Sequence, residues 1–396
     1  MSEVRPQLLI TLVHGTWPRG LFPKIARFKQ WVRRLLRRKH LGPPPFWFEE
    51  GSPFWARLST ELGNIPHKIT PLIWSGANSI FVRDKTAHAL VEHLLAEHSE
   101  HPQATQLVIA HSHGGNIALR ALNHLQKHEE AKSSNPLVVT LAAPFIEIHQ
   151  ANFGNRPTII RWMLIAIMMC LAIVVSYLLR DMVLLIAGAL LVPPISLWWF
   201  ARRAILRQYK VKRLSDATRI FDMTLSQSRR SLVIRAVDDE ASLILAVDAA
   251  LNYLISRLLT YTFFLFVVGF VAALWLSVGI FAGVPDSRSI NHSLLDSIWW
   301  RAIAWTSIIL VTSIPAGILL LIMLALSRSV HGRELAVSPM DCQINTQSTP
   351  DADSLSKTVT LVRRTYTKSL RHGIYDHEDC TKTISDWVRS QLEYTH

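Results

Sequence analysis

The stretch of residues 107–119 constrains the fold of this chain more than any other. It reads Leu-Val-Ile-Ala-His-Ser-His-Gly-Gly-Asn-Ile-Ala-Leu, which is an apolar run typical of a buried strand, a serine, and then an amphipathic helical pattern. A serine on a sharp turn between a strand and a helix needs small residues two positions before and after it, and Ala110 and Gly114 occupy those positions. The pattern predicts a nucleophile elbow that exposes the Ser112 hydroxyl at a helix N-terminus, where N–H groups stabilise negative charge. The alternative is a buried serine in an ordinary polar turn.

A second motif follows the first apolar run, residues 7–13, where the chain continues as His14-Gly15-Thr16. Gly15 would let the backbone approach a bound carbonyl group closely. The backbone N–H groups of Thr16 and His113 would then form an oxyanion hole with two donors. The alternative is a plain turn that ends the strand.

Strand-like and helix-like patterns alternate through the first 150 residues. This order predicts a mostly parallel sheet with right-handed crossover connections. The expected strands are 7–13, 68–74, the run before Ser112 and 136–145, and the expected helices are 54–62, 82–98 and the one after Ser112.

Four long apolar segments interrupt the globular pattern at residues 163–179, 182–200, 261–284 and 302–326. Each is close to the ~20 residues that cross a bilayer. They predict two transmembrane hairpins, and an even number of crossings leaves all the globular pieces on one side. The connecting loops hold few cations, so the positive-inside rule places the globular part in the cytoplasm of an integral, multi-pass membrane protein. The first hairpin could instead be a shallow re-entrant one.

The formal net charge of +13 favours an anionic membrane surface as a partner. Residues 22–40 form a basic amphipathic pattern that carries Phe28 and Trp31 and predicts a helix at the membrane interface, or else a solvated surface helix. The chain shows no nucleic-acid motif, and residues 1–21 do not resemble a signal peptide. Its three cysteines do not predict a disulfide framework.

A carboxylate pair, Asp238-Asp239, follows a strand-like run at residues 231–237. A carboxylate on the loop after a late strand could orient a catalytic histidine, and we favour Asp239 with Asp238 as the alternative. Either residue could instead simply cap the helix that follows.

Two histidines, His372 and His377, lie between the last predicted strand, 358–363, and the last predicted helix, 379–392. His372 is closer to the strand and precedes Gly373, which suits a projecting loop. We therefore favour His372 as the general base, with His377 as the alternative. Either could also be a solvated loop histidine.

The other histidines do not predict a metal site. His88, His93, His98 and His101 do not share one tight helical spacing. His124 and His128 are four residues apart, but no third ligand is evident. We expect neither a metal nor a cofactor.

The order Ser112, Asp239, His372, together with His14-Gly15 and the elbow, resembles the lipase and esterase branch of the α/β-hydrolase superfamily. The resemblance covers residues 1–150, 206–255 and 340–396, and Ala110 departs from the glycine that is usual there. Three further segments, at residues 74–79, 239–242 and 372–375, are similar to a group of lipase-like hydrolases. The resemblance implies a mostly parallel sheet with helices on both faces, interrupted here by the two transmembrane hairpins.

The resemblance and the four apolar segments together predict a division of the chain. The expected segments are a core with oxyanion strand and elbow at 1–150, a hairpin at 158–200, a core piece with the acid and a lid at 206–255, a hairpin at 260–326, and a core piece with the last strand, the histidine loop and the C-terminal helix at 335–396.

The resemblance implies a serine hydrolase that cleaves carboxylic esters through an acyl-enzyme. The predicted membrane segments and the basic helix favour a membrane-anchored enzyme with a lipid or acyl-chain substrate. The alternatives are a thioesterase, amidase or protein deacylase of the same fold, or a catalytically silent membrane scaffold.

Overall fold

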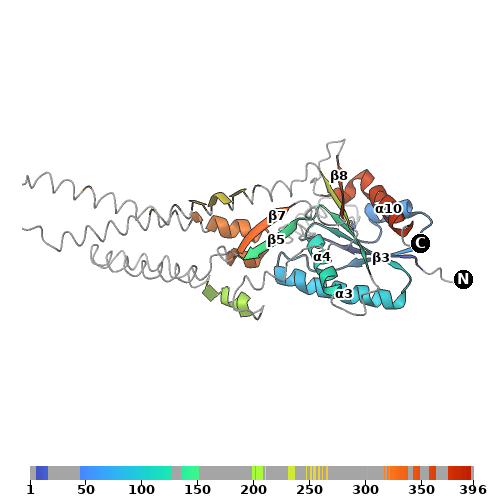
Figure 1. The fold of residues 1–396 in the computed structure, drawn as a ribbon, viewed down its shortest axis with the longest axis horizontal. Helices are drawn as coiled ribbons and strands as arrows, with labels where there is room; N and C mark the ends of the chain where they lie inside the picture. The colour runs from blue at the N-terminus through green and yellow to red at the C-terminus, as the bar shows by residue number, and fades with distance from the viewer. Residues whose placement is uncertain are drawn as a thin grey trace, which may run out of the picture.

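The computed structural model describes residues 6–16, 45–126, 135–150, 231–236, 322–337, 342–347, 356–362 and 373–393, with short pieces between 199 and 320. Six strands form one parallel sheet in the order β2-β1-β3-β4-β6-β8 (Figure 1). The strands are β1 (Leu8–Val13), β2 (His67–Leu72), β3 (Thr105–His111), β4 (Leu137–Leu141), β6 (Ser231–Ala236) and β8 (Ser356–Leu361). Because the strands are parallel, their carboxyl ends lie at one edge of the sheet.

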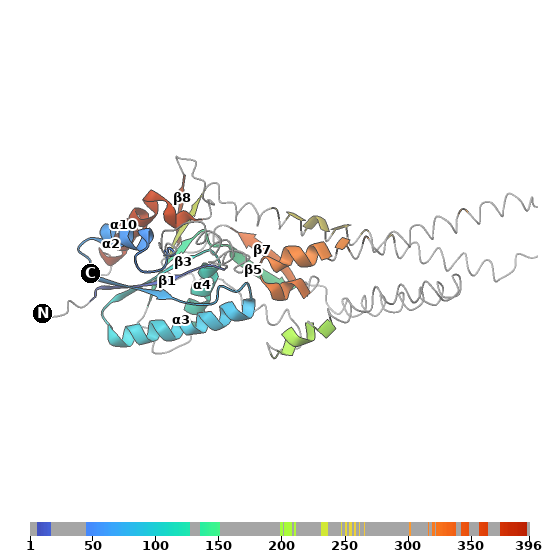
Figure 2. The same cartoon turned by 180° about the vertical axis from the view of Figure 1, so that it is seen from behind.

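Helices cover both faces of this sheet (Figures 1 and 2). Helices α2 (Pro53–Leu62) and α10 (Glu378–Glu393) pack on one face, and α3 (Ile80–Glu100) and α4 (His113–Leu125) on the other. Alternate residues of β3 enter the two cores: Leu107 contributes to the α2/α10 core, and Val108 to the α3/α4 core. Burial on both faces explains why the central strands are mostly apolar.

Local capping fixes where two of these helices begin. The Ser52 side chain accepts a hydrogen bond from the Trp55 N–H, 3.2 Å, at the start of α2. The Ser79 hydroxyl accepts one from the Val82 N–H, 3.2 Å, at the start of α3. Both serines satisfy helical N–H groups that have no intrahelical partner.

Two strands outside the main sheet pair with each other. Strand β5 (Phe145–Gln150) is antiparallel to β7 (Cys342–Gln347) and joins parts of the chain that are far apart in sequence. The sequence patterns did not predict β7 as a strand.

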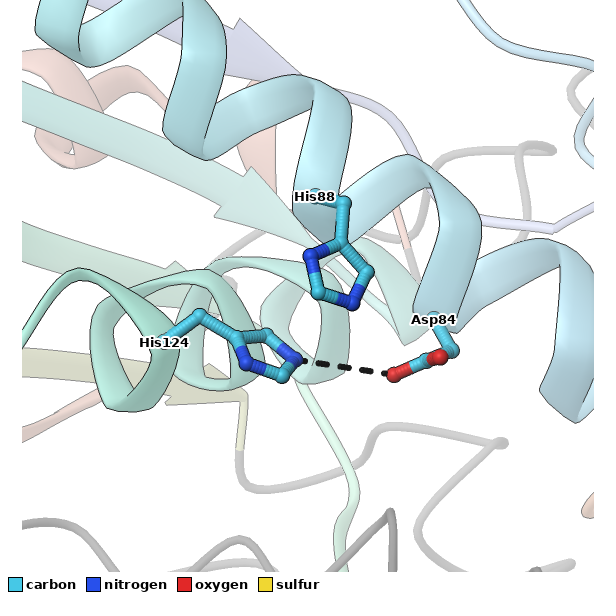
Figure 3. Close-up of side chains that lie close together, drawn as sticks. All are labelled: Asp84, His88 and His124. Atoms are coloured by element: carbon cyan, nitrogen blue, oxygen red, sulfur yellow. Dashed lines mark ion pairs between the residues drawn. The ribbon is translucent and has the colours of Figure 1, made fainter. Parts of the chain in front are cut away.

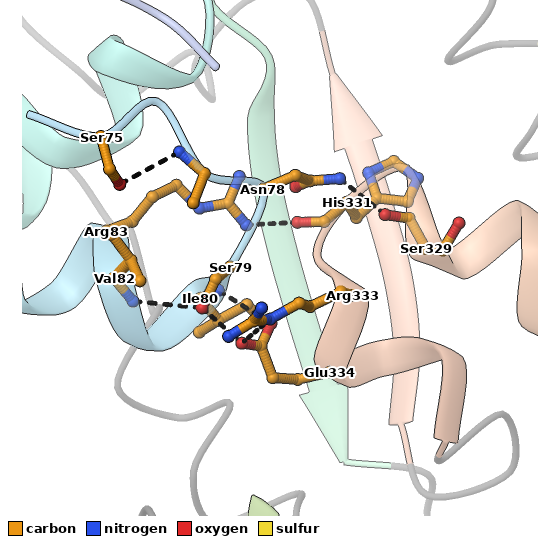
Figure 4. A network of polar contacts seen from close by, with 11 residues as sticks. Ser75, Asn78, Ser79, Ile80, Val82, Arg83, Ser329, His331, Arg333 and Glu334 are labelled. Atoms are coloured by element: carbon orange, nitrogen blue, oxygen red, sulfur yellow. Dashed lines mark hydrogen bonds and ion pairs between the residues drawn. The ribbon is translucent and has the colours of Figure 1, made fainter. Parts of the chain in front are cut away.

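The segment just before β7 is fastened to the N-terminus of α3 (Figure 4). The buried carboxylate of Glu334, in the 3₁₀ helix η3 (Arg333–Val337), accepts hydrogen bonds from the Ser79 hydroxyl and from the Ile80 N–H, the latter at 2.9 Å. The Asn78 side chain donates to the Ser329 carbonyl at 2.7 Å. A negative charge at the start of a helix is stabilised by the helix dipole, so these contacts hold residues 329–334 against the sheet body.

The predicted architecture requires one correction. Of the helices in the described part of the chain, none combines the length and the apolar character needed to cross a bilayer. Helix α3 has 21 residues, but it carries charged side chains such as Asp84 and Glu92 along its length. The prediction of a sheet interrupted by two transmembrane hairpins is therefore wrong for the described structure, which is a parallel α/β sheet with helices on both faces. Most of the segments 158–200 and 260–326 lie outside the described residues, as does the predicted interfacial helix at 22–40.

Candidate active site

Ser112 has a backbone conformation that is costly for a serine. It lies between β3 and α4 with φ +53° and ψ −133°. Its N–H donates to the Leu141 carbonyl at 2.8 Å, and its own carbonyl accepts from the Gly115 N–H at 2.9 Å, so the backbone is held on both sides. A residue other than glycine in this region costs about 1–3 kcal/mol, and such strain concentrates at functional sites.

The Ser112 side chain does not cap the helix that it precedes. It occupies the N-cap position of α4, yet it makes no capping hydrogen bond to that helix. An ordinary N-cap serine turns its oxygen toward the N–H groups of the first turn. The half-buried hydroxyl of Ser112 is therefore not explained as a helix cap, which weighs against the interpretation as an ordinary polar turn.

Three glycines surround the elbow because neighbouring atoms leave no room for a Cβ atom at these positions. A Cβ atom on Gly15 would lie 2.8 Å from the Ser112 Cβ and 3.3 Å from its Oγ. A Cβ on Gly114 would lie 2.5 Å from the Val13 carbonyl oxygen, and one on Gly115 would lie 2.5 Å from the Ala143 Cβ. The end of β1 therefore touches the serine directly, and the elbow is built by close backbone approach.

Gly114→Ala is expected to lower the free energy of unfolding by about 1–3 kcal/mol, the usual effect of overpacking. The added methyl group would meet the carbonyl oxygens of Val13 and His14, which are backbone atoms that cannot rotate away. Helix propensity alone predicts the opposite sign, a gain of about 1 kcal/mol for alanine over glycine. Urea denaturation of the two proteins measures the difference, and a gain in stability would contradict the packing described for the elbow.

The elbow lies at the point where the strand order reverses. From β1 the chain first adds β2 on one side and then β3 on the other. In open parallel sheets, ligands bind in the crevice beyond the carboxyl ends of the strands at such a switch point. Gly15 and Ser112 follow β1 and β3 and meet there.

The side chain of His113 is fixed by two donors. Nη1 of Arg83 donates to its Nδ1 at 2.7 Å, and the Asn116 amide nitrogen lies 3.0 Å from the same atom. Since a guanidinium can only donate, Nδ1 of His113 acts as an acceptor. The imidazole is thus held in a buried structural contact, and His113 is the first residue of α4. Thr16 is half-buried and directly follows Gly15.

Arg83 is the residue of this site that the sequence did not reveal. Its side chain is only 1% exposed, and it also donates to the His331 carbonyl (Figure 4). It therefore links the segment that precedes η3 to the residue that follows Ser112. An arginine in an amphipathic helix gives no sequence signal of such burial, because most are solvated.

His14 supports the end of β1. Its ring stacks on Phe48 and Trp74, with centroids 4.4 and 5.3 Å away, and its Nδ1 donates to the Gly15 carbonyl at 2.8 Å. The Trp74 Nε1–H donates to the His14 carbonyl at 2.9 Å. Burial lowers the pKa of His14 below its ordinary value, so the ring is neutral at neutral pH. His14 thus positions the backbone of Gly15 and Thr16.

The loop before α10 packs beside the elbow. The Tyr375 ring, in the 3₁₀ helix η4 (Ile374–Asp376), lies 5.0 Å from the ring of His111, the residue before Ser112. Trp47 stacks on Tyr375 at 5.2 Å, and Arg57 donates to the Tyr375 carbonyl at 3.2 Å. The described chain that begins at Gly373 is therefore held against the elbow by aromatic and polar contacts.

His377 has both ring nitrogens engaged with backbone groups. Its Nε2 donates to the Val362 carbonyl at 3.3 Å, and its Nδ1 accepts from the Asp379 N–H at 3.1 Å. The ring is 7% exposed and caps the start of α10. This arrangement explains His377 as a structural residue that ties the end of β8 to α10.

Asp238, Asp239 and His372 lie outside the described residues. Strand β6 ends two residues before Asp238, and its Ile234 carbonyl accepts a hydrogen bond from the Ala142 N–H at 2.9 Å. Both acid candidates thus follow the carboxyl end of a strand in the same sheet as β3. Of the predicted site residues, Ser112 and His113 lie at the start of α4, Thr16 directly follows Gly15, which packs against Ser112, and His377 caps α10.

No family model, curated protein or solved structure matches this chain.

Proposed function

We propose that this protein is a serine hydrolase that cleaves carboxylic esters through an acyl-enzyme formed on Ser112. The observation that carries the proposal is the strained backbone of Ser112, with φ +53°, in a residue whose side chain does not cap its helix. A conformation of this cost is expected where it exposes a reactive group.

In the proposed reaction, the Ser112 oxygen attacks the carbonyl carbon and its proton passes to His372. Asp239 orients the His372 ring and stabilises its positive charge. The N–H groups of Thr16 and His113 stabilise the oxyanion. The protonated imidazole gives its proton to the leaving alcohol, and water then releases the acid by the reverse sequence.

The choice of His372 over His377 as the base is supported by packing. His377 has backbone partners at both ring nitrogens, whereas the chain immediately after His372 packs on the residue before the serine. Asp239 remains the proposed acid, with Asp238 as the alternative.

A lipid or other acyl-chain substrate, met at a membrane with the hydrolase body on the cytoplasmic side, is part of the proposal. It is supported by the net charge of +13 and by large apolar side chains left in solvent, among them Phe200 at 63% and Leu326 at 65% exposed. Exposed apolar and cationic groups together favour an anionic lipid surface.

A series of p-nitrophenyl esters with increasing acyl length tests the proposal. Wild-type protein in detergent is expected to release a burst of about one nitrophenolate per molecule, followed by slower turnover, because an acyl-enzyme accumulates. Parallel thioester and amide substrates distinguish a thioesterase or amidase of the same fold. A folded protein that acts on none of these acyl donors would be a catalytically silent scaffold, and the proposed function would be wrong.

A further inference from the structure

Three potential metal ligands meet on the face of the α3/α4 pair that is turned away from the sheet core. Asp84 and His88 lie one turn apart on α3, and His124 lies in the last turn of α4. One ligand atom from each residue can be chosen so that all lie within 4.8 Å of one another. Figure 3 shows the three side chains directed toward one another from the two helices.

The contacts within this cluster leave ligand atoms available. Nε2 of His124 is buried and lacks a hydrogen-bond partner among the described residues; it lies 3.7 Å from Oδ1 of Asp84. The rings of His88 and His124 are tilted by 30° with centroids 4.1 Å apart. A buried imidazole nitrogen whose contact with a carboxylate oxygen is as long as 3.7 Å is poorly satisfied, and a metal ion would satisfy it.

Arg120 holds the carboxylate in place. Its Nε donates to Oδ1 of Asp84 at 3.1 Å, which leaves Oδ2 for a further contact. Carboxylates that bind metals are commonly hydrogen-bonded by a second residue that fixes their orientation. The positive charge of Arg120 lowers the affinity for a cation, and the charge of Asp84 offsets it.

We propose that Asp84, His88 and His124 bind one divalent ion of the zinc class, with water completing the coordination. Two imidazoles and one carboxylate suit Zn²⁺ and disfavour Mg²⁺ and Ca²⁺, which prefer oxygen ligands. Ligands around tetrahedral zinc lie roughly 3.3 Å apart, so small side-chain rotations within the 4.8 Å cluster complete the site.

The site joins α3 to α4 without reaching the reaction centre. His124 is twelve residues after Ser112, which is about 18 Å along the helix at the usual rise. The bound ion is therefore a structural clamp on the helix that carries Ser112 at its other end. The sequence did not predict Asp84 as a third ligand, because Asp84 and His124 are brought together only by the packing of α3 on α4.

Calorimetry and thermal unfolding of the full-length, untagged protein test the site, with ZnCl₂ as the probe and MgCl₂ as the comparison. Zn²⁺ is expected to bind at one equivalent in this cluster and to raise Tm, because a ligand that binds only the folded state stabilises it. His88→Gln and His124→Gln are expected to weaken Zn²⁺ binding by about tenfold or more and to abolish the rise in Tm. The His88 side chain is exposed, so its variant is expected to fold.

His93→Gln is the matched control, because His93 lies on the same helix and its Nε2 is 3.5 Å from the Glu97 carboxylate. This variant is expected to bind Zn²⁺ like the wild type. The proposal is overturned if the wild type binds no Zn²⁺, if His88→Gln binds it undiminished, or if the loss occurs in His93→Gln instead.

Discussion

Ser112→Ala is expected to lower kcat for ester hydrolysis by a factor on the order of 10⁴–10⁶ and to leave the fold intact. A large effect is expected because, in the proposed mechanism, the serine oxygen forms the covalent intermediate. Stability is expected to change little, since the hydroxyl does not cap α4 and alanine meets the same backbone conformation with a smaller side chain.

The measurement is steady-state hydrolysis of the best ester, with a thermal unfolding curve for each protein. Ser99→Ala is the matched control: Ser99 is exposed near the end of α3, and its hydroxyl donates only to the Ala96 carbonyl, 2.7 Å. That variant is expected to retain full activity. A tenfold loss of activity corresponds to a rise of roughly 1.4 kcal/mol in the activation barrier. If Ser112→Ala keeps a tenth or more of the activity, Ser112 is not the nucleophile.

His372→Asn and His377→Asn form the second pair of variants, and their effects are expected to differ sharply. His372→Asn is expected to reduce kcat by about 10⁴-fold or more, because the proposed general base is lost. His377→Asn removes an imidazole but can still accept the backbone hydrogen bond that caps α10, since asparagine is a favourable N-cap residue. Loss of a general base lowers kcat by roughly 10²-fold or more. The loss of activity in His377→Asn is expected to be smaller than this.

A stability measurement separates the two roles of these histidines. His377→Ala removes both ring contacts, with Val362 and with Asp379, and is expected to lower the free energy of unfolding by about 1–3 kcal/mol. His372→Asn should leave the unfolding transition where it is. Activity lost in His377→Asn and kept in His372→Asn would reverse the assignment of the base.

The central strands were predictable because they are buried on both faces. Strands β1 and β3 are mostly apolar, and all of their residues except Thr105 are buried. The serine at the end of β3 was predictable for a related reason: small residues around it are required by contacts such as that of Gly114 with the Val13 carbonyl.

Other features have no local signal. Strand β7 has the sequence Cys-Gln-Ile-Asn-Thr-Gln, in which only Cys342 and Ile344 are apolar, and it pairs with β5, which is far away in the sequence. The burial of Arg83 depends on His113 and on the His331 carbonyl, both distant in the chain. The length of the four apolar segments predicted two transmembrane hairpins, and this prediction was wrong: none of the helices in the described ranges could span a bilayer.

If Ser112 is an activated nucleophile, it forms a covalent bond with a fluorophosphonate, and the labelled residue can be mapped. The native protein is treated with a fluorophosphonate, digested, and analysed by mass spectrometry to locate the modified residue. One phosphonyl group is expected, on Ser112, in the peptide that contains His111 and His113. A folded protein that takes no label, or that carries it on another serine while Ser112 stays unmodified, would show that Ser112 is not the nucleophile.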